Sequence, residues 1–369
     1  MDSLQYILAP CWLAIMAMFG HAAGAYRKER VLGQAERRAT WFYALLVVLP
    51  LIIFAGTRSL NFGDGYAYWI SYRTIPDAFV GKLRYVMDSA KDQGYYALEA
   101  LISVFLPRNR MGYFTVIAAL QIFFLAKTYR KFSEDFWMAM FVFVVSTDYL
   151  SWVQNGMRQF LAVTVAFAAS GLLFRKKLVW YSAVVLIAST FHRSALLLIP
   201  IAFFVQGKSW NWKMLLILLG TIVVVNSTGL FTSVLGSVLE DTQYRNVAYD
   251  MTHYGDDGTN PLRVLVYSIP TILSLFCRKK INREGGRVIQ IACNMGIVST
   301  AMYLVSMVTS GILIGRLPIY CSLYANGILL PWELKHMFAH NTGRMVRMAA
   351  IGCYLLFYVF TLHFQWGLI

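Results

Sequence analysis

The sequence predicts an all-α protein that crosses a membrane many times, and the first two supporting observations are its composition and its apolar stretches. Hydrophobic residues make up 58% of the 369 residues, charged residues only 14%, and the mean hydropathy is +0.56. These values lie outside the range of soluble globular domains. The apolar stretches are continuous and near the ~20 residues that span a bilayer as a helix. They are too long for the alternating strands of an outer-membrane barrel.

The third observation is how basic residues are distributed among the loops. About a dozen apolar stretches are predicted as spans, and basic loops alternate with balanced ones between them. The basic loops and the span ends beside them carry 21 of the 33 Lys and Arg but only 6 of the 18 Asp and Glu. Basic loops stay cytoplasmic under the positive-inside rule. The opposite side is therefore the outer face, and its charges balance.

The predicted spans follow one another along the whole chain. Their approximate bounds are 4–25, 40–56, 111–129, 136–152, 157–174, 178–191, 194–206, 212–230, 262–277, 288–311, 316–332 and 345–366. The first is predicted as a retained span, because it has no basic leader and no convincing cleavage site. The short runs 178–191 and 194–206 are predicted as two spans, or as a span with a re-entrant partner. A single crossing there would reverse the charge pattern of every later loop.

The sequence predicts a single transmembrane domain, residues 1–369, with two long outward loops. The first loop, 57–110, ends in a partly amphipathic stretch that suits a short helix at the membrane interface. The second loop, 227–261, mixes acidic, amide and Tyr side chains. That composition suits hydroxyl-rich ligands and suits an ordinary solvated loop equally well.

Several classes of site are not supported by the sequence. The five cysteines lie within apolar runs or at their ends, so they predict neither disulfides nor a metal site. The adjacent acids Asp256 and Asp257 are a weak metal signal, because no fixed partners accompany them. No nucleotide-binding loop, zinc helix or nucleophile elbow is present. We therefore expect no metal, no cofactor and no nucleic-acid partner.

Three arginines stand at the outer ends of predicted spans, where a charge is costly and usually has a partner or a function. Arg58 follows the second span, Arg158 opens the fifth and Arg316 opens the eleventh. A guanidinium keeps its charge and binds phosphate oxygens through paired N–H groups, so converging arginines suit a diphosphate. Each arginine alone is equally compatible with an interfacial anchor.

Two further positions suit proton transfer. His192 lies with Arg193 in a turn between two apolar runs, and an imidazole exchanges protons near neutral pH, as a general base must. Asp64 has a glycine on each side, which allows close backbone approach to a ligand. The alternatives are a hydrogen-bonding histidine at a helix end and an ordinary turn aspartate.

In order and spacing, these residues resemble the EpsG family of Wzy-type bacterial polysaccharide polymerases. The similar segments, which cover about residues 55 to 325, are Arg58, Gly63, Asp64 and Tyr68 in the first outer loop, Glu99 in GYYALEALI, Met157–Ala162, the turn Phe191–Ala195 with Ile199 and Pro200, and Gly315–Tyr320. The insert Ser59–Phe62 departs from the family's pattern.

The resemblance implies a GT-C-like helical fold in the bacterial inner membrane and a glycosyltransferase activity. A growing glycan would pass from undecaprenyl diphosphate to the non-reducing end of a lipid-linked repeat unit at the periplasmic face. The implied partners are undecaprenyl diphosphate-linked oligosaccharides and the lipid bilayer, and a chain-length regulator is left open. The implied catalytic residues are His192 and Asp64, and the implied substrate-binding residues are Arg58, Arg158, Arg193, Arg316, Gln159 and Tyr320.

Other activities stay open on the sequence alone. An O-antigen ligase, or another glycosyltransferase that uses polyprenyl-linked donors, shares this architecture and differs in its acceptor or donor. A lipid or glycan transporter would show inverted repeats, and the sequence shows no such self-similarity. A membrane acyltransferase would place a histidine in mid-span, whereas His192 lies at an outer turn. The sugar, its linkage and the oligomeric state are not indicated.

Overall fold

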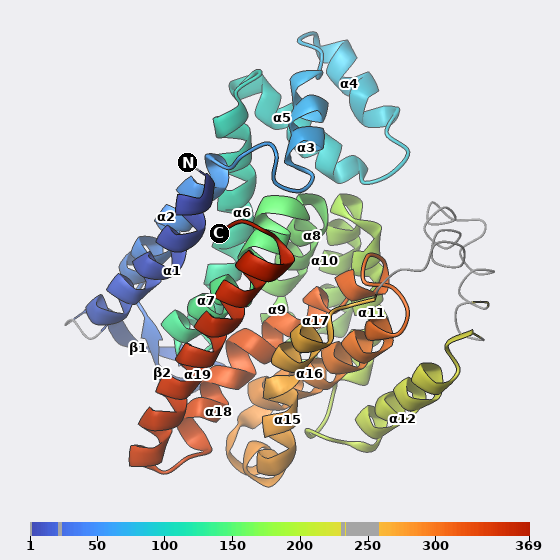
Figure 1. Ribbon diagram of the computed structural model, residues 1–369. Helices are drawn as coiled ribbons and strands as arrows, with labels where there is room; N and C mark the ends of the chain where they lie inside the picture. The colour runs from blue at the N-terminus through green and yellow to red at the C-terminus, as the bar shows by residue number, and fades with distance from the viewer. Residues whose placement is uncertain (1, 21–23, 230–232, 234–257) are drawn as a thin grey trace. The chain divides into compact units, whose positions relative to one another are not determined.

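The computed structural model describes residues 2–20, 24–229, 233 and 258–369 (Figure 1). The outward loop predicted at 227–261 lies mostly outside these residues. Contacts group the chain into two compact units: unit 1 is Met1–Pro200 with Leu334–Ile369, and unit 2 is Ile201–Glu333.

In its described residues, unit 1 is helical apart from one hairpin. Its elements are α1 (Asp2–Phe19), β1 (Tyr26–Val31), β2 (Gln34–Ala39), α2 (Trp41–Gly56), α3 (Gly65–Arg73), α4 (Phe79–Met87), α5 (Gln93–Phe105), α6 (Arg110–Phe132), α7 (Phe136–Val145), η1 (Tyr149–Asn155), α8 (Met157–Ala168), α9 (Ser170–Phe174), α10 (Leu178–Phe191), η2 (Arg193–Leu197), α19 (His340–Phe360) and η5 (Thr361–Gln365). Helix α6 packs against both α2 and α8 and so lies at the centre of this unit.

Unit 2 is also helical in its described residues. Its elements are α12 (Trp212–Asn226), α15 (Pro261–Glu284), α16 (Gly286–Met307), η3 (Ile314–Arg316), α17 (Ile319–Tyr324) and η4 (Ala325–Leu329). The chain passes between the units within α11 (Leu198–Phe204) and α18 (Leu330–His336). Helix α16 is buried on nearly all sides and packs against α12, α15 and α17.

The predicted fold class is confirmed as an all-α membrane protein. Four described helices are long and apolar enough to cross a membrane: Arg110–Phe132, Pro261–Glu284, Gly286–Met307 and Asn341–Gln365. The pair α7 and η1 makes a fifth if the bent pair counts as one span. Shorter apolar helices overlap most of the other predicted spans. The count of twelve crossings and the GT-C-like arrangement stay predictions.

The predicted cytoplasmic connection 26–39 is a β-hairpin, which the sequence did not predict. Strands β1 and β2 pair antiparallel from Tyr26 opposite Ala39 to Val31 opposite Gln34. The connecting Leu32 and Gly33 have φ angles of 50° and 94°. Two left-handed residues in succession form the tight turn whose twist matches paired strands. The hairpin was not predicted, because its basic residues were interpreted only as those of a cytoplasmic loop.

The span predicted at 136–152 is sharply broken. Helix α7 and the π-helical segment η1 meet at an angle of 77°. Thr147, between them, has a φ of 72°, and Gly156 donates its backbone N–H to the carbonyl of Ser151, five residues back. This wider turn ends where α8 begins, so the break determines where Arg158 lies.

The predicted break near residue 192 is confirmed. Helix α10 ends at Phe191, His192 is extended with φ −161° and ψ 121°, and the 3-10 segment η2 begins at Arg193. Segment η2 contacts both α10 and α8, so the chain folds back beside the helix that it has just left. Whether these two segments cross the bilayer separately stays a prediction.

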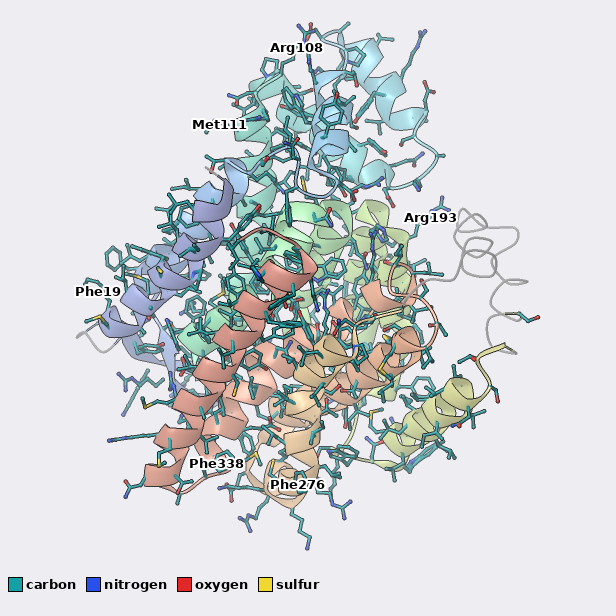
Figure 2. The ribbon with its side chains drawn as sticks, viewed as in Figure 1. Phe19, Arg108, Met111, Arg193, Phe276 and Phe338 are labelled. Atoms are coloured by element: carbon teal, nitrogen blue, oxygen red, sulfur yellow. The ribbon has the colours of Figure 1, made fainter. Side chains whose placement is uncertain are left out.

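Within unit 1, the predicted outward loop 57–110 and the predicted cytoplasmic loop 26–39 lie at opposite ends. The loop folds into α3, α4 and α5 at the end where α6 begins, whereas the β1–β2 hairpin lies at the end where α6 finishes (Figure 1). Figure 2 shows Arg108 and Met111 at the first end and Phe338 toward the other. Within unit 1, the charge pattern therefore agrees with a physical separation of these two loops.

Candidate active site

The site lies where α3, α4 and α5 meet the first turn of α6. Tyr72, Tyr95 and Tyr113 form a buried cluster there with Phe114. The rings of Tyr72 and Tyr113 stack with centroids 4.2 Å apart. Asn109 caps α6 by accepting a hydrogen bond from the backbone N–H of Gly112, which fixes the start of this helix beneath α3, α4 and α5.

At the centre of the cluster is a buried carboxylate, that of Glu99 on α5. Its exposed fraction is 0%. Oε1 accepts a hydrogen bond from the hydroxyl of Tyr113 at 2.5 Å, and Oε2 accepts one from Tyr85 at 2.6 Å. The Ser71 hydroxyl also lies 3.5 Å from Oε2. Neutral hydroxyls from three other helices therefore surround this carboxylate, and no cation pairs with it directly in the described residues.

The hydroxyls that bind Glu99 are themselves hydrogen-bonded to further hydroxyls, on one side in the core and on the other side nearer the surface. The Tyr95 and Tyr113 hydroxyls are 2.9 Å apart, and both side chains are buried. The Tyr85 and Ser71 hydroxyls are 2.8 Å apart, and both side chains are half-buried. One carboxylate oxygen is thus anchored in the core, whereas the other is linked toward the surface.

Burial raises the pKa of Glu99 to about 7, although hydrogen bonds from Tyr113 and Tyr85 and the charge of Arg158 act in the opposite direction. A carboxyl removed from water disfavours its ionised form, and hydroxyl donors compensate only in part. Glu99 therefore exchanges its proton near neutral pH, which is unusual for a glutamate.

Arg158 lies beside this cluster on α8. Its Nη1 is 3.3 Å from Oδ2 of Asp92 and 3.4 Å from the hydroxyl of Tyr96, and its guanidinium faces the ring of Tyr68 at 5.8 Å. The Arg158 side chain is 28% exposed. A guanidinium held by a carboxylate and two aromatic residues, and still reachable from outside, suits binding of an anionic group.

Asp92 connects Arg158 to the predicted His192 turn. It begins α5 in a left-handed conformation with φ 57°. Burial raises the pKa of Asp92, while the charges of Arg158 and Lys91 and the backbone N–H of Arg193 act against this rise. Sequence reasoning missed Asp92, because an acidic residue before a helix is an ordinary capping signal.

The turn that contains His192 packs on the start of α5. Arg193, labelled in Figure 2, donates from Nη2 to the carbonyl of Ala90 at 3.4 Å. His192 Nδ1 lies 2.6 Å from the hydroxyl of Ser194. A Cβ on Gly94 would come within 2.2 Å of the Thr190 hydroxyl, so glycine permits this close approach. The structure thus brings Arg158, Asp92 and Arg193 into one region.

Arg58 lies beneath the site, not at its surface. It is 1% exposed, its Nη1 donates to the carbonyls of Val153 at 3.0 Å and Gln154 at 2.7 Å, and its guanidinium faces the ring of Phe114 at 4.1 Å. These bonds fix the end of η1, just before α8. Substrate binding by Arg58 stays a prediction, and the observed contacts are those of a residue that positions Arg158.

Asp64 is exposed at the start of α3. Its backbone N–H donates to Oδ1 of Asn155 at 2.8 Å. Gly63 has a φ of 54°, and a Cβ there would come within 2.2 Å of Asn155. Glycine at position 63 therefore permits close approach to the Asn155 side chain, and approach of a ligand to this backbone stays a prediction.

The remaining predicted site residues are divided between the units. Gln159 is buried on α8 next to Arg158. Arg316 is exposed in η3 and Tyr320 is buried in α17, and both belong to unit 2. Participation of Arg316 and Tyr320 in one site with Arg158 stays a prediction.

Sequence reasoning noted Glu99 only through the family resemblance and did not find its partners Ser71, Tyr85 and Tyr113. A signal was present, because Glu99 is the one acid in the run Tyr95–Phe105. A charge in an amphipathic apolar stretch indicates a buried partner. Among the residues that the structure describes, no three His, Cys, Asp or Glu side chains gather as metal ligands would.

The chain was compared with known proteins. No curated protein and no solved structure matches it. A model of the EpsG family matches residues 41–366, which contain every segment on which the resemblance rests. Because this match covers nearly the whole sequence, the chain belongs to the EpsG family.

Proposed function

We propose that this protein is a polysaccharide polymerase of the bacterial inner membrane, with its active site at the periplasmic face. Membership of the EpsG family indicates a polysaccharide polymerase-type activity and a glycosyltransferase reaction at the coarse level. In the proposed reaction, a growing glycan leaves undecaprenyl diphosphate and joins the non-reducing end of a lipid-linked repeat unit. Because the lipid-linked donor is already activated, the proposed transfer needs no nucleotide.

The observation that carries the proposal is the placement of Arg158 against Asp92, Tyr68 and Tyr96. The lipid-linked donor leaves as a diphosphate, whose developing charge is stabilised by a cation that does not titrate. Asp92 fixes the direction of Arg158, and the partial exposure of this guanidinium lets a ligand reach it. The same end of unit 1 carries Arg193, which adds a second positive charge.

Aromatic side chains around Arg158 suit the sugar portion of the substrate. Tyr68, Trp69 and Tyr96 are half-buried, and Tyr66 is exposed. Aromatic rings stack on the C–H faces of sugars, while hydroxyl groups exchange hydrogen bonds with sugar hydroxyls. This end of unit 1 therefore combines a cationic contact for diphosphate with an aromatic contact for glycan.

The transfer itself requires two kinds of protein group, a cation for the leaving diphosphate and a base for the acceptor hydroxyl. The anomeric carbon develops positive charge in an oxocarbenium-like transition state, and the acceptor hydroxyl must lose its proton. Arg158 and Arg193 stabilise the leaving diphosphate. His192 and Asp64 are the bases that the family resemblance implies, and both lie at this end of unit 1 on segments adjoining the site.

The test is incubation of the purified protein with lipid-linked repeat units, followed by separation of the products on a gel. We expect a ladder of glycans, and Arg158→Ala should lower turnover by about 100- to 1,000-fold, as for loss of a charge-stabilising donor. Arg158→Lys keeps the charge but loses the paired N–H groups, so its turnover should lie between that of the wild type and that of Arg158→Ala.

The matched control is Arg108→Ala. Arg108 follows α5 at the same end of unit 1 but forms an exposed ion pair with Asp77, in which the side chains are 60% and 68% exposed. Such pairs contribute little, so this variant should polymerise as the wild type does. Normal turnover by Arg158→Ala would remove Arg158 from the site. If the protein transfers the glycan once to a different acceptor and no ladder forms, it is a ligase and not a polymerase.

A further inference from the structure

We propose that Glu99 takes up the proton of the acceptor hydroxyl during glycan transfer, by way of the hydroxyl of Tyr85. This inference rests on the proposed function and names the proton acceptor for it. It moves that role away from His192 and Asp64, which were chosen on residue type and position in the sequence.

The first argument is connection to the surface. Glu99 is fully buried, yet its Oε2 accepts from Tyr85, whose hydroxyl lies 2.8 Å from that of half-buried Ser71. A sugar hydroxyl at this position can donate to the Tyr85 oxygen while Tyr85 donates to Glu99. The hydroxyl pair therefore provides a short path from the outer face to a carboxylate that solvent does not reach.

The second argument is the direction of the hydrogen bonds. Both Tyr113 and Tyr85 donate to Glu99, so the carboxylate is the final acceptor of each. Oε1 is fixed in the core by Tyr113, which Tyr95 contacts from behind. Oε2 faces the half-buried pair. One oxygen thus holds the carboxylate in place and the other receives the proton.

The third argument is the charge environment. The titratable and charged groups that face Glu99 are Tyr72 from α3, Tyr85 from α4, Tyr95 from α5 itself, Tyr113 from α6 and Arg158 from α8. The tyrosines are neutral near pH 7, because burial raises the pKa of Tyr72, Tyr85 and Tyr95. Arg158 is the one cation of this group, and its charge favours the ionised, proton-accepting form of Glu99.

The other candidate bases are occupied or oriented differently. His192 has Nδ1 2.6 Å from the Ser194 hydroxyl, within its own turn. Asp64 is exposed, and its fixed contact is made by its backbone N–H. Asp92 is paired with Arg158. Glu99 is the carboxylate whose hydrogen bonds are all with hydroxyls, the groups that pass protons on.

In the proposed step the acceptor oxygen bonds to the anomeric carbon of the growing glycan. The bond between that carbon and the diphosphate oxygen breaks, and its electron pair leaves with undecaprenyl diphosphate beside Arg158. The acceptor proton moves to the Tyr85 oxygen as the phenolic proton of Tyr85 moves to Oε2 of Glu99. Glu99 then returns its proton to water by the same route, and no other reagent is required.

The test compares three variants in the polymerisation assay, with turnover and KM measured separately. Glu99→Gln keeps an oxygen that accepts from tyrosine but cannot take a proton, so turnover should fall by about 100- to 10,000-fold with little change in KM. Tyr85→Phe breaks the route and should also lose turnover. Glu99→Asp should recover part of the activity with a shifted pH profile, which a purely structural role would not produce.

Asp77→Asn is the control, because Asp77 lies in the same segment and is exposed. Normal turnover and an unchanged pH profile in both Glu99→Gln and Tyr85→Phe would overturn the inference, and His192→Gln and Asp64→Asn, assayed in parallel, would then identify the base. If Glu99→Gln does not accumulate as folded protein, Tyr85→Phe decides alone. Absence of a ladder from the wild type would instead overturn the proposed function, and the role of Glu99 with it.

Discussion

Glu99 and Glu134 are the same residue type near opposite ends of α6, and they are bound in opposite ways. Glu99 is held by Tyr113, near the start of the helix, and by other hydroxyls. Glu134 follows the end of the helix and accepts from Lys335 at 2.7 Å and His336 at 2.9 Å. The two helix positions, 113 and 132, are about 28 Å apart along the axis.

The two environments move the pKa in opposite directions. Burial raises the pKa of Glu99 to about 7. Burial also acts to raise the pKa of Glu134, but hydrogen bonds from His336 and Lys335 outweigh it and lower the value to about 2. Neutral donors orient a carboxylate and leave it able to take a proton, whereas a cationic donor such as Lys335 keeps it ionised. One end of unit 1 is thus suited to proton exchange and the other to permanent attachment.

The attachment at the second end joins distant parts of the chain. Lys335 and His336 end α18, and Glu134 lies in the turn between α6 and α7. In the same turn Asp135 pairs with Arg347 of α19 at 2.7 Å. These contacts hold the C-terminal segment of unit 1 to its first half, and none involves a tyrosine hydroxyl.

The largest effect expected from this contrast is in the pH dependence of turnover. If Glu99 must be ionised, turnover should rise about tenfold per pH unit below pH 7 and level off above it. The wild-type rate at pH 5 should therefore be about 100-fold below its plateau. The measurement is initial polymerisation rate between pH 5 and 9, with saturating substrate. A profile that is flat across this range would show that Glu99 does not exchange the proton.

A smaller effect is expected from Glu134→Gln, which should leave that pH profile unchanged and lower stability by about 1 kcal/mol, the upper end for partly exposed ion pairs. The measurement is thermal unfolding in detergent at several pH values. Because the folded pKa of Glu134 is depressed, its contribution is present above about pH 4.5 and is lost as pH falls toward 2. Glu134→Gln should not show this loss of stability as the pH falls.

Glu99 should show the reverse sign in the same experiment. Its raised pKa means that its contribution is complete below about pH 4.5 and is lost as pH rises through 7. The wild-type protein should therefore lose stability between about pH 4.5 and pH 7, and Glu99→Gln should lose less over this range. If both glutamine variants respond to pH alike, the contrast between the two ends of α6 is wrong.

The smallest effect is expected from Arg347→Ala. Its partner Asp135 is 18% exposed, but the arginine itself is 45% exposed, so solvent screens the pair. We expect a loss of about 0.5 kcal/mol in the same unfolding assay, and normal turnover. A loss as large as that of Glu134→Gln would show that the attachment at this end acts as one network.

The sequence was sufficient for features that depend on local composition. Apolar runs predicted the helices, the break at His192 appeared from two short runs, and the charge pattern agreed with the separation of loops across unit 1. The hairpin at 26–39 was missed, because charged residues on paired strands produce no apolar alternation.

The site was less predictable, because its partners come from separate helices. Arg158 was found as a charge at the end of a span. Nothing in the sequence places Tyr85 and Tyr113 on the two oxygens of Glu99, since each pair is 14 residues apart on different helices. The burial of Arg58 was also invisible, because an arginine after an apolar run reads as an interfacial anchor.

The π-helical segment η1 has a consequence for the length of this chain. Its wide turn holds one residue more than an α-helix would hold over the same rise. Deleting one residue between Ser151 and Gly156 would leave the four-residue spacing of an α-helix where the Gly156 N–H now bonds the carbonyl five residues back. The carbonyls of Val153 and Gln154, which accept from Arg58, lie within this wide turn. The number of residues in η1, and not only their identity, therefore determines how Arg58 holds the segment that precedes α8.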